Sequence, residues 1–180
     1  ALALSIDIPH NVIQKALQEF RPGRHRIEII LENDSISWVD DSKATNPHAA
    51  IASLNSHLSV IWIAGGLAKG ADMEGLVQRC KKRIKAVILI GEDSELIEGA
   101  LQKFAPEVPR VRVESPGSYV KGQTDNSLME QVVTQALTFA TSGDTVLLAP
   151  ACASMDQFVS YADRGDRFAA AVKKLVSHAN

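Results

Sequence analysis

Apolar runs of strand length alternate with helical segments along most of this chain. In three places, at residues 37–47, 60–72 and 145–157, an apolar run is followed by a short loop of small or polar residues and then by the start of a helix. Strands that are separated in this way by helices indicate right-handed βαβ units. The sequence therefore predicts an α/β fold with a mainly parallel sheet.

The first two strands are expected to form a hairpin. Apolar runs at 27–32 and 36–39 flank Asn33-Asp-Ser, which is typical of a tight turn. This predicts an N-terminal antiparallel hairpin at one edge of the sheet. The other expected strands lie at 60–64, 86–90, 110–114 and 145–149, and the expected helices lie at 9–20, 47–57, 73–83, 94–103, 126–141 and 156–177, the last of them interrupted at Gly165.

Composition limits the kind of protein that this chain can be. A length of 180 residues with 46% hydrophobic residues is enough for one full core. The net charge of −2, without long like-sign runs, and the 5% aromatic content argue against nucleic acid as a partner. No apolar run approaches the roughly 20 residues of a membrane span, and residues 1–4 do not resemble a signal peptide. We expect a cytoplasmic protein that does not bind membranes.

The N-terminal segment differs from the rest of the chain. Its expected helix carries an apolar stripe without an obvious partner, and Arg21-Pro-Gly-Arg24 then breaks the helical pattern. We therefore expect residues 1–22 to be a terminal helix and linker left over from an upstream domain, and residues 23–180 to form the domain itself.

Polar side chains follow three of the expected strands. The carboxyl ends of parallel strands meet at one edge of an open α/β sheet, where ligands bind. Lysines, hydroxyls and helix N-termini at such an edge favour an anion. The loop residues expected at this edge are Asp41, Lys43, Thr45, Lys69 and Ser154.

Helix caps are the alternative role for several of these residues. Asn46, Asp72 and Ser154 stand where a side chain would cap a helix, and Ser154-Met-Asp-Gln157 fits a capping box. A minor alternative for Asp41 and Lys43 is a solvated ion pair at a strand end. Each residue alone is compatible with a purely structural role.

Several common sites are not encoded. Gly65-Gly-Leu-Ala-Lys-Gly70 does not have the order of a P-loop, and no dinucleotide fingerprint follows any expected strand. The five histidines are scattered, so we expect no metal site. Cys80 and Cys152 do not form a disulfide framework, and Cys152 is expected to be a small packing residue.

Four motifs together resemble the C-terminal domain of the Mur ligase family. They are Asp41-Ser-Lys-Ala-Thr-Asn46, Gly65-Gly-Leu-Ala-Lys-Gly-Ala-Asp72, Pro150-Ala-Cys-Ala-Ser-Met-Asp-Gln-Phe158 and Arg164-Gly-Asp-Arg-Phe168. The resemblance implies a Rossmann-like three-layer domain that receives an amino acid. Residues 1–22 would then be the last helix and linker of the family's central ATPase domain.

The resemblance also implies an activity. Family members of this kind use ATP to add D-glutamate to UDP-N-acetylmuramoyl-L-alanine through an acyl phosphate, a cytoplasmic step of peptidoglycan synthesis. The cofactors would be ATP and Mg²⁺, with the P-loop and the Mg²⁺ ligands in the central domain. The partners of this chain would be the substrates and its own N-terminal and central domains, and the isolated chain is expected to be inactive.

Roles for individual residues follow from the same resemblance. Asp41 would bind the ribose of ATP, and Arg26 would reach the nucleotide from the domain boundary. Lys43 would lie near the phosphates or support domain closure, and it is the single catalytic candidate. D-glutamate would be held by Thr45, Lys69, Ser154, the backbone of Met155 and Tyr161, a position where the family often has Phe.

Two other functions remain open at this point. One is a stand-alone module that binds a small acidic metabolite without catalysis. The other is a ligase similar to folylpolyglutamate synthetase, which shares the architecture and adds glutamate to a folate.

Overall fold

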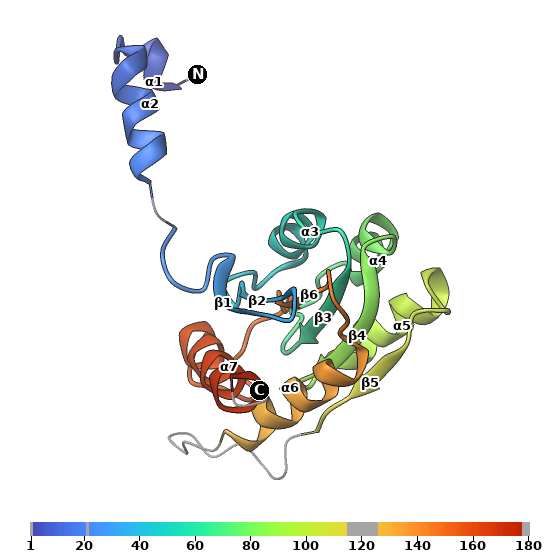
Figure 1. Cartoon of the computed structure of the whole chain (residues 1–180). Helices are drawn as coiled ribbons and strands as arrows, with labels where there is room; N and C mark the ends of the chain where they lie inside the picture. Colours follow the sequence, from blue (N-terminus) through green and yellow to red (C-terminus); the bar gives the residue numbers. More distant parts are fainter. Residues whose placement is uncertain (1, 21, 115–125, 178–180) are drawn as a thin grey trace.

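The computed structural model describes residues 2–20, 22–114 and 126–177, and its strands form one sheet in the order β1-β2-β6-β3-β4-β5 (Figure 1). β1 and β2 are antiparallel, whereas every other pairing is parallel. The strands are β1 (Glu28–Asn33), β2 (Ile36–Asp40), β3 (Val60–Gly65), β4 (Ile84–Ile90), β5 (Arg110–Arg112) and β6 (Thr145–Leu148). The predicted mainly parallel sheet with an antiparallel hairpin is confirmed.

Helices cover both faces of this sheet, which makes three layers. α3, α4 and α5 pack on one face, and α6 and α7 pack on the other (Figure 1). The bounds are α1 (Leu2–Ser5), α2 (His10–Glu19), α3 (Pro47–Asn55), α4 (Met73–Cys80), α5 (Ser94–Phe104), α6 (Ser127–Phe139) and α7 (Tyr161–Val176). Because β3, β4 and β6 are enclosed by both helix layers, they read as nearly continuous apolar runs.

The hairpin turn has the expected chemistry. Asn33 pairs with Ile36, so Asp34 and Ser35 are the two turn residues. Both have positive φ angles, of 51° and 60°. Two consecutive residues of this kind form the hairpin turn whose twist matches that of the flanking strands. Asp tolerates the left-handed conformation better than most residues, which explains why Asn33-Asp-Ser could be predicted as a tight turn.

The start of the last helix was predicted wrongly. α7 begins at Tyr161, not at 156, and Ser154 does not cap it. Ser160 is the cap instead: its Oγ accepts from the backbone N–H of Asp163 at 3.1 Å, while Oδ2 of Asp163 accepts from Val159 N. Two cap-like motifs lie six residues apart, and the second one starts the helix. Residues 155–157 form only a turn.

Gly165 does not interrupt α7, which contradicts the sequence prediction. The helix runs through it, and Gly165 is buried. A Cβ at this position would overlap the side chains of His25 and Asp40. The glycine therefore serves close packing rather than a break in the helix.

The arm formed by α1 and α2 stands away from the sheet and its helices (Figure 1). None of the side chains of α2 is buried, although Val12 and Leu17 are large and apolar. Arg21, part of the expected linker, lies outside the described residues. The expected helix at 9–20 is confirmed as α2, and no described residue of the arm belongs to either core cluster.

Other expectations concern membranes and thiols. No helix in the described part of the chain is both long and apolar enough to cross a membrane. Cys80 and Cys152 are free thiols and are buried, which agrees with the packing role expected for Cys152. Burial raises the pKa of Cys152 to about 12, so this thiol is protonated and unreactive at neutral pH.

A buried carboxylate organises the amino edge of the sheet. Asp144 precedes β6 and accepts hydrogen bonds from Ser59 Oγ and from the backbone and hydroxyl of Thr141, and it also pairs with Lys85. Burial raises the pKa of Asp144, but these donors outweigh burial and lower it to about 2. The charged form is therefore stabilised in the folded protein.

We expect Asp144→Asn to lower the free energy of unfolding by about 2 kcal/mol at pH 7, because a group with a depressed pKa stabilises the fold only while it is ionised. This contribution is complete above the unfolded pKa of about 4 and is lost as the pH falls towards 2. Urea denaturation of both proteins between pH 7 and pH 2.5 measures the effect. A difference that does not shrink with acidity would contradict it.

Candidate functional site

The loops that follow β2, β3 and β6 are hydrogen-bonded to one another at the carboxyl edge of the sheet. We call them the β2 loop (residues 41–46), the β3 loop (66–72) and the β6 loop (149–160). Ala151 N donates to Ala44 O at 2.9 Å, which joins the β6 and β2 loops. Leu67 and Ala153 exchange two backbone hydrogen bonds, both of 2.9 Å, which join the β6 and β3 loops.

Gly66 and the carboxylate of Asp93 hold the β3 loop in place, and the carboxylate of Asp156 joins the β6 loop to the loop after β4. Gly66 has a φ of 126°, and a Cβ there would overlap the carbonyl oxygen of Ala153. Asp93, after β4, accepts from Ala68 N at 2.7 Å, and Asp156 accepts from Glu92 N at 2.9 Å. The loop after β4 is thereby tied to the same rim.

The predicted site residues occupy this rim. Thr45 lies in the β2 loop, Lys69 lies two residues beyond Leu67 in the β3 loop, and Ser154 directly follows Ala153. Lys69 is exposed, so its side chain is open to a ligand. Its backbone has a φ of 52°. Ser154 is 3% exposed and Met155 is 59% exposed. The predicted convergence of these loops on one edge is therefore correct, whereas the binding roles stay predictions.

Two helices begin at this rim with the predicted caps. Asn46 Oδ1 accepts from Ala49 N at 3.0 Å at the start of α3, and Asp72 Oδ1 accepts from Gly75 N at 3.0 Å at the start of α4. Both N-termini contribute a positive dipole end to the edge. An anion at the rim is favoured by this field as well as by Lys69.

Lys43 of the β2 loop contacts Tyr161, the first residue of α7. Nζ of Lys43 lies 3.7 Å from the centroid of the Tyr161 ring, a cation–π contact. Ser42 Oγ donates to the carbonyl of Tyr161 at 2.7 Å, which fixes the first residue of α7 against the same loop. The structure thus joins a residue expected near the phosphates to one expected in the amino-acid pocket.

Asp41 is more enclosed than the sequence suggested. It is 8% exposed, and burial raises its pKa, while the nearby Ser53, the backbone of Ile27 and the charge of Arg26 oppose that shift. Asp41 therefore does not form the solvated pair with Lys43 that the sequence left open. Arg26 itself is exposed, on the segment that leads into β1.

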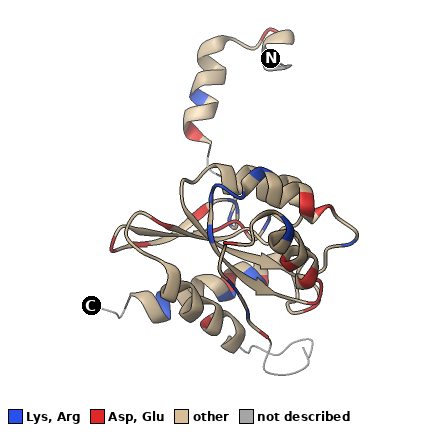
Figure 2. Ribbon diagram, turned by 90° about the vertical axis from the view of Figure 1, so that its right-hand side faces the viewer, with Lys and Arg blue, Asp and Glu red and all other residues tan. Residues whose placement is uncertain are grey.

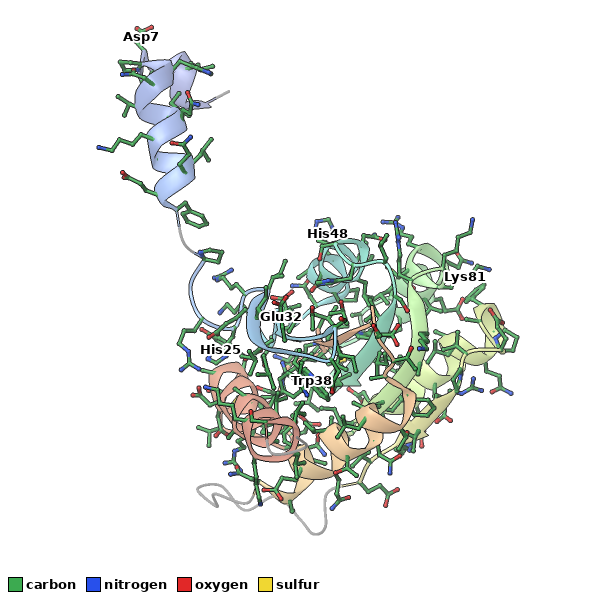
Figure 3. The ribbon with its side chains drawn as sticks, viewed as in Figure 1. Asp7, His25, Glu32, Trp38, His48 and Lys81 are labelled. Carbon is green, nitrogen blue, oxygen red and sulfur yellow. The ribbon has the colours of Figure 1, made fainter. Side chains whose placement is uncertain are left out.

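Sequence reasoning missed a buried cluster beside this loop. Nδ1 of His25 is 2.7 Å from Oδ2 of Asp40, and His25 N donates to Oε2 of Glu28 at 2.8 Å. His25 lies where the linker reaches α7 (Figure 3). Ligand atoms of these three residues lie within 4.8 Å of one another, although the sequence predicted only scattered histidines. Every one of them already has a hydrogen-bond or charge partner within the cluster.

Arg164 is a further residue for which the sequence predicted no role. It is fully buried, and its guanidinium donates to Ser42 in the β2 loop and to Cys152 in the β6 loop. Burial lowers its pKa to about 10, so it remains charged at neutral pH. The available signal was its spacing, because Arg164 falls on the apolar stripe that continues through Phe168 and Val172.

Charge on the rest of the surface is mixed. Figure 2 shows basic and acidic residues interspersed over the body of the molecule, without a continuous basic stripe.

An open, mainly parallel α/β sheet with helices on both faces defines a domain of the doubly wound α/β class. Comparison with known families is then specific: the model described as Mur ligase, glutamate ligase domain, matches residues 25–152. The chain belongs to this family.

Two curated relatives with high sequence identity share one name. The chain is 48% identical over 175 residues to the UDP-N-acetylmuramoylalanine–D-glutamate ligase of Streptomyces avermitilis, a match that covers 97% of this chain and 36% of that protein. It is 45% identical to the enzyme of the same name from Mycobacterium avium, with coverage of 98% and 40%. This chain therefore spans well under half the length of these relatives.

Solved structures share the fold. The UDP-N-acetylmuramate–alanine ligase of Thermotoga maritima aligns over 98% of this chain and 35% of its own with a TM-score of 0.60 and 16% identity. The folylpolyglutamate synthase of Mycobacterium tuberculosis aligns over 94% of this chain and 35% of its own with a TM-score of 0.55 and 12% identity. At these identities the likeness concerns the fold alone.

Proposed function

We propose that this chain is the amino-acid-binding domain of a ligase that adds D-glutamate to UDP-N-acetylmuramoyl-L-alanine in the cytoplasmic stage of peptidoglycan synthesis. The observation that carries the proposal is the hydrogen-bonded rim, where the β2, β3 and β6 loops bring Thr45, Lys69 and Ser154 to one edge. The identity to ligases of that name over nearly the whole chain supports it.

The rim suits D-glutamate chemically. D-glutamate carries two carboxylates, and each is best held by a cation, by hydroxyls or by free backbone donors. Lys69 supplies the cation, and Thr45 and Ser154 supply hydroxyls. The backbone of Met155 and the ring of Tyr161 complete the pocket. A single lysine with a flexible stem binds one carboxylate as a point charge and leaves the other to the hydroxyls and helix ends.

The nucleotide would meet the β2 loop. Asp41 has a carboxylate that can accept hydrogen bonds from ribose hydroxyls, and Arg26 lies close enough to act on its charge. Lys43 in the same loop would face the phosphates once it leaves the Tyr161 ring. Bound ATP would supply the phosphoryl group that activates the carboxylate of the UDP-linked substrate.

Magnesium does not fit the one ligand-like cluster of the described residues. Mg²⁺ prefers octahedral oxygen ligands and retains several waters. His25, Glu28 and Asp40 include a nitrogen and are bonded to one another rather than directed at an open position. We therefore assign the Mg²⁺ ligands of the proposed reaction to the upstream part of the full-length protein.

The N-terminal arm fits a position at the boundary with an upstream domain. We propose that residues 1–22 belong with the central ATPase domain of the full-length protein and that residues 23–180 form the C-terminal domain. The arm leaves large apolar side chains such as Val12 and Leu17 exposed, 50% and 72% respectively. An upstream domain would cover this face of α2.

Phosphate release by the full-length gene product tests the function. We expect release from ATP only when both D-glutamate and UDP-N-acetylmuramoyl-L-alanine are present, and no turnover from residues 1–180 alone. Parallel assays replace the UDP-linked substrate by a folate with L-glutamate. Turnover with the folate pair would favour a folylpolyglutamate synthetase-like enzyme, and binding of D-glutamate without any turnover would favour a non-catalytic module.

A further inference from the structure

Arg164 contacts two of the three rim loops through one planar group. Nε donates to Ser42 Oγ and Nη2 donates to Ser42 O, both at 2.9 Å. Nη1 and Nη2 both donate to Cys152 O at 3.3 Å. Ser42 stands between Asp41 and Lys43, and Cys152 lies two residues before Ser154.

We propose that Arg164 is a positioning residue that fixes the β2 loop and the β6 loop as one unit, so that the nucleotide side and the amino-acid side of the rim keep a common geometry. This inference rests on the proposed function, because it assigns a task to a residue that touches neither substrate. Its guanidinium reaches three acceptor atoms on two separate loops, which a lysine ammonium cannot reproduce.

The position of the acceptor atoms distinguishes a role in positioning the loops from a role in stabilising the fold. All of them lie in loops beyond the strand ends, whereas the apolar stripe of α7 around Arg164 packs without polar help. An apolar side chain would fill that stripe at no desolvation cost. An apolar side chain could not form the hydrogen bonds that keep Ser42 and Cys152 in fixed positions relative to each other.

Ser42 extends the same link to α7. Its Oγ accepts from Arg164 and donates to Tyr161 O at 2.7 Å, and its backbone N–H donates to Asp40 at 2.8 Å. The loop that carries Asp41 and Lys43 is thus tied to the first residue of α7. Displacement of a bound substrate by about 1 Å can reduce rate by about 100-fold, so loop register matters for a reaction between two substrates.

Steady-state kinetics of the full-length protein test the proposal. We expect Arg164→Lys to raise KM for ATP and for D-glutamate together, each by about tenfold, and Ser42→Ala to raise both by about threefold. The KM for UDP-N-acetylmuramoyl-L-alanine is expected to stay unchanged, because the proposed function assigns neither of the loops that Arg164 contacts to that substrate. Ser42→Ala is the milder variant, which keeps the test valid if Arg164→Lys folds poorly.

Asp144→Asn is the matched control, because it removes a buried charge with several hydrogen bonds at the opposite edge of the sheet. We expect it to lower the melting temperature without raising either KM. The proposal is wrong if Ser42→Ala and Arg164→Lys leave both KM values unchanged, or if Asp144→Asn raises them equally.

Hydrogen exchange separates failure of this inference from failure of the proposed function. If the wild-type protein shows no D-glutamate-dependent phosphate release, the proposed function fails. Exchange still tests the coupling: Ser42→Ala should speed exchange of the Ala44 and Ala151 amides together, whereas unchanged exchange at either of them would refute the link.

Discussion

Gly165→Ala is expected to lower the free energy of unfolding by about 3 kcal/mol. The added Cβ would lie 2.5 Å from Oδ2 of Asp40 and even closer to Nδ1 of His25. Neither side chain can move easily, because they are bonded to each other at 2.7 Å and both are almost completely buried. Urea denaturation of residues 1–180 followed by circular dichroism measures the loss.

Gly99→Ala is the matched control. Gly99 lies in α5, is exposed, and has no atom within 4 Å of an added Cβ. Alanine in an open helical position is expected to raise stability by about 0.5–1 kcal/mol. Opposite signs for the two glycines would support steric packing as the reason for Gly165. A Gly165→Ala protein as stable as the wild type would show that α7 and the linker can separate without cost.

Lys69→Ala in the full-length protein is expected to raise KM for D-glutamate by about 10- to 100-fold. The physical reason is the loss of one charge-assisted hydrogen bond, about 1.5–3 kcal/mol, to a ligand carboxylate. The fold should be unaffected, because Lys69 is exposed. The positive φ of Lys69 does not change the expected stability of the variant, because lysine and alanine meet the same backbone strain at this position. Initial rates at varied D-glutamate measure the change.

Lys81→Ala controls for general loss of positive charge. Lys81 follows α4 at the opposite end of that helix from the rim (Figure 3), and its Nζ donates to Phe104 O at 3.3 Å. We expect no change in KM for D-glutamate from this variant. An unchanged KM in Lys69→Ala would remove Lys69 from the proposed pocket, and equal effects of both variants would point to long-range electrostatics instead.

Local signals in the sequence were sufficient for the order and type of the strands and helices, but not for the start of α7 or its course through Gly165. The short apolar runs of β3, β4 and β6 are typical of parallel strands that are covered on both faces, and Asn46 and Asp72 marked helix starts by their capping chemistry. The error at the start of α7 arose because Ser154 and Ser160 both begin cap-like motifs. Only the hydrogen bonds of Asp163 with Val159 and Ser160 distinguish them.

The site was predictable in part. Loops after parallel strands converge by topology, so Thr45, Lys69 and Ser154 could be assigned to one edge before any coordinates existed. The enclosure of Asp41, the contact of Lys43 with Tyr161 and the bonds of Arg164 to Ser42 were not predictable. The two contacts join residues more than 100 positions apart, and the enclosure depends on what covers a side chain.

The sequence by itself determined the alternation of strands and helices, the hairpin turn and the chemistry available at the strand ends, because these depend on neighbours within a few residues. Tertiary structure alone decided which buried charges hold the rim together. The guanidinium of Arg164 gains its partner Ser42 only when distant segments pack together. His25 likewise meets Asp40 only in the folded protein, where Gly165 leaves room for both side chains. Once these groups are buried, they need their hydrogen-bond partners, because an unpaired buried polar group is costly.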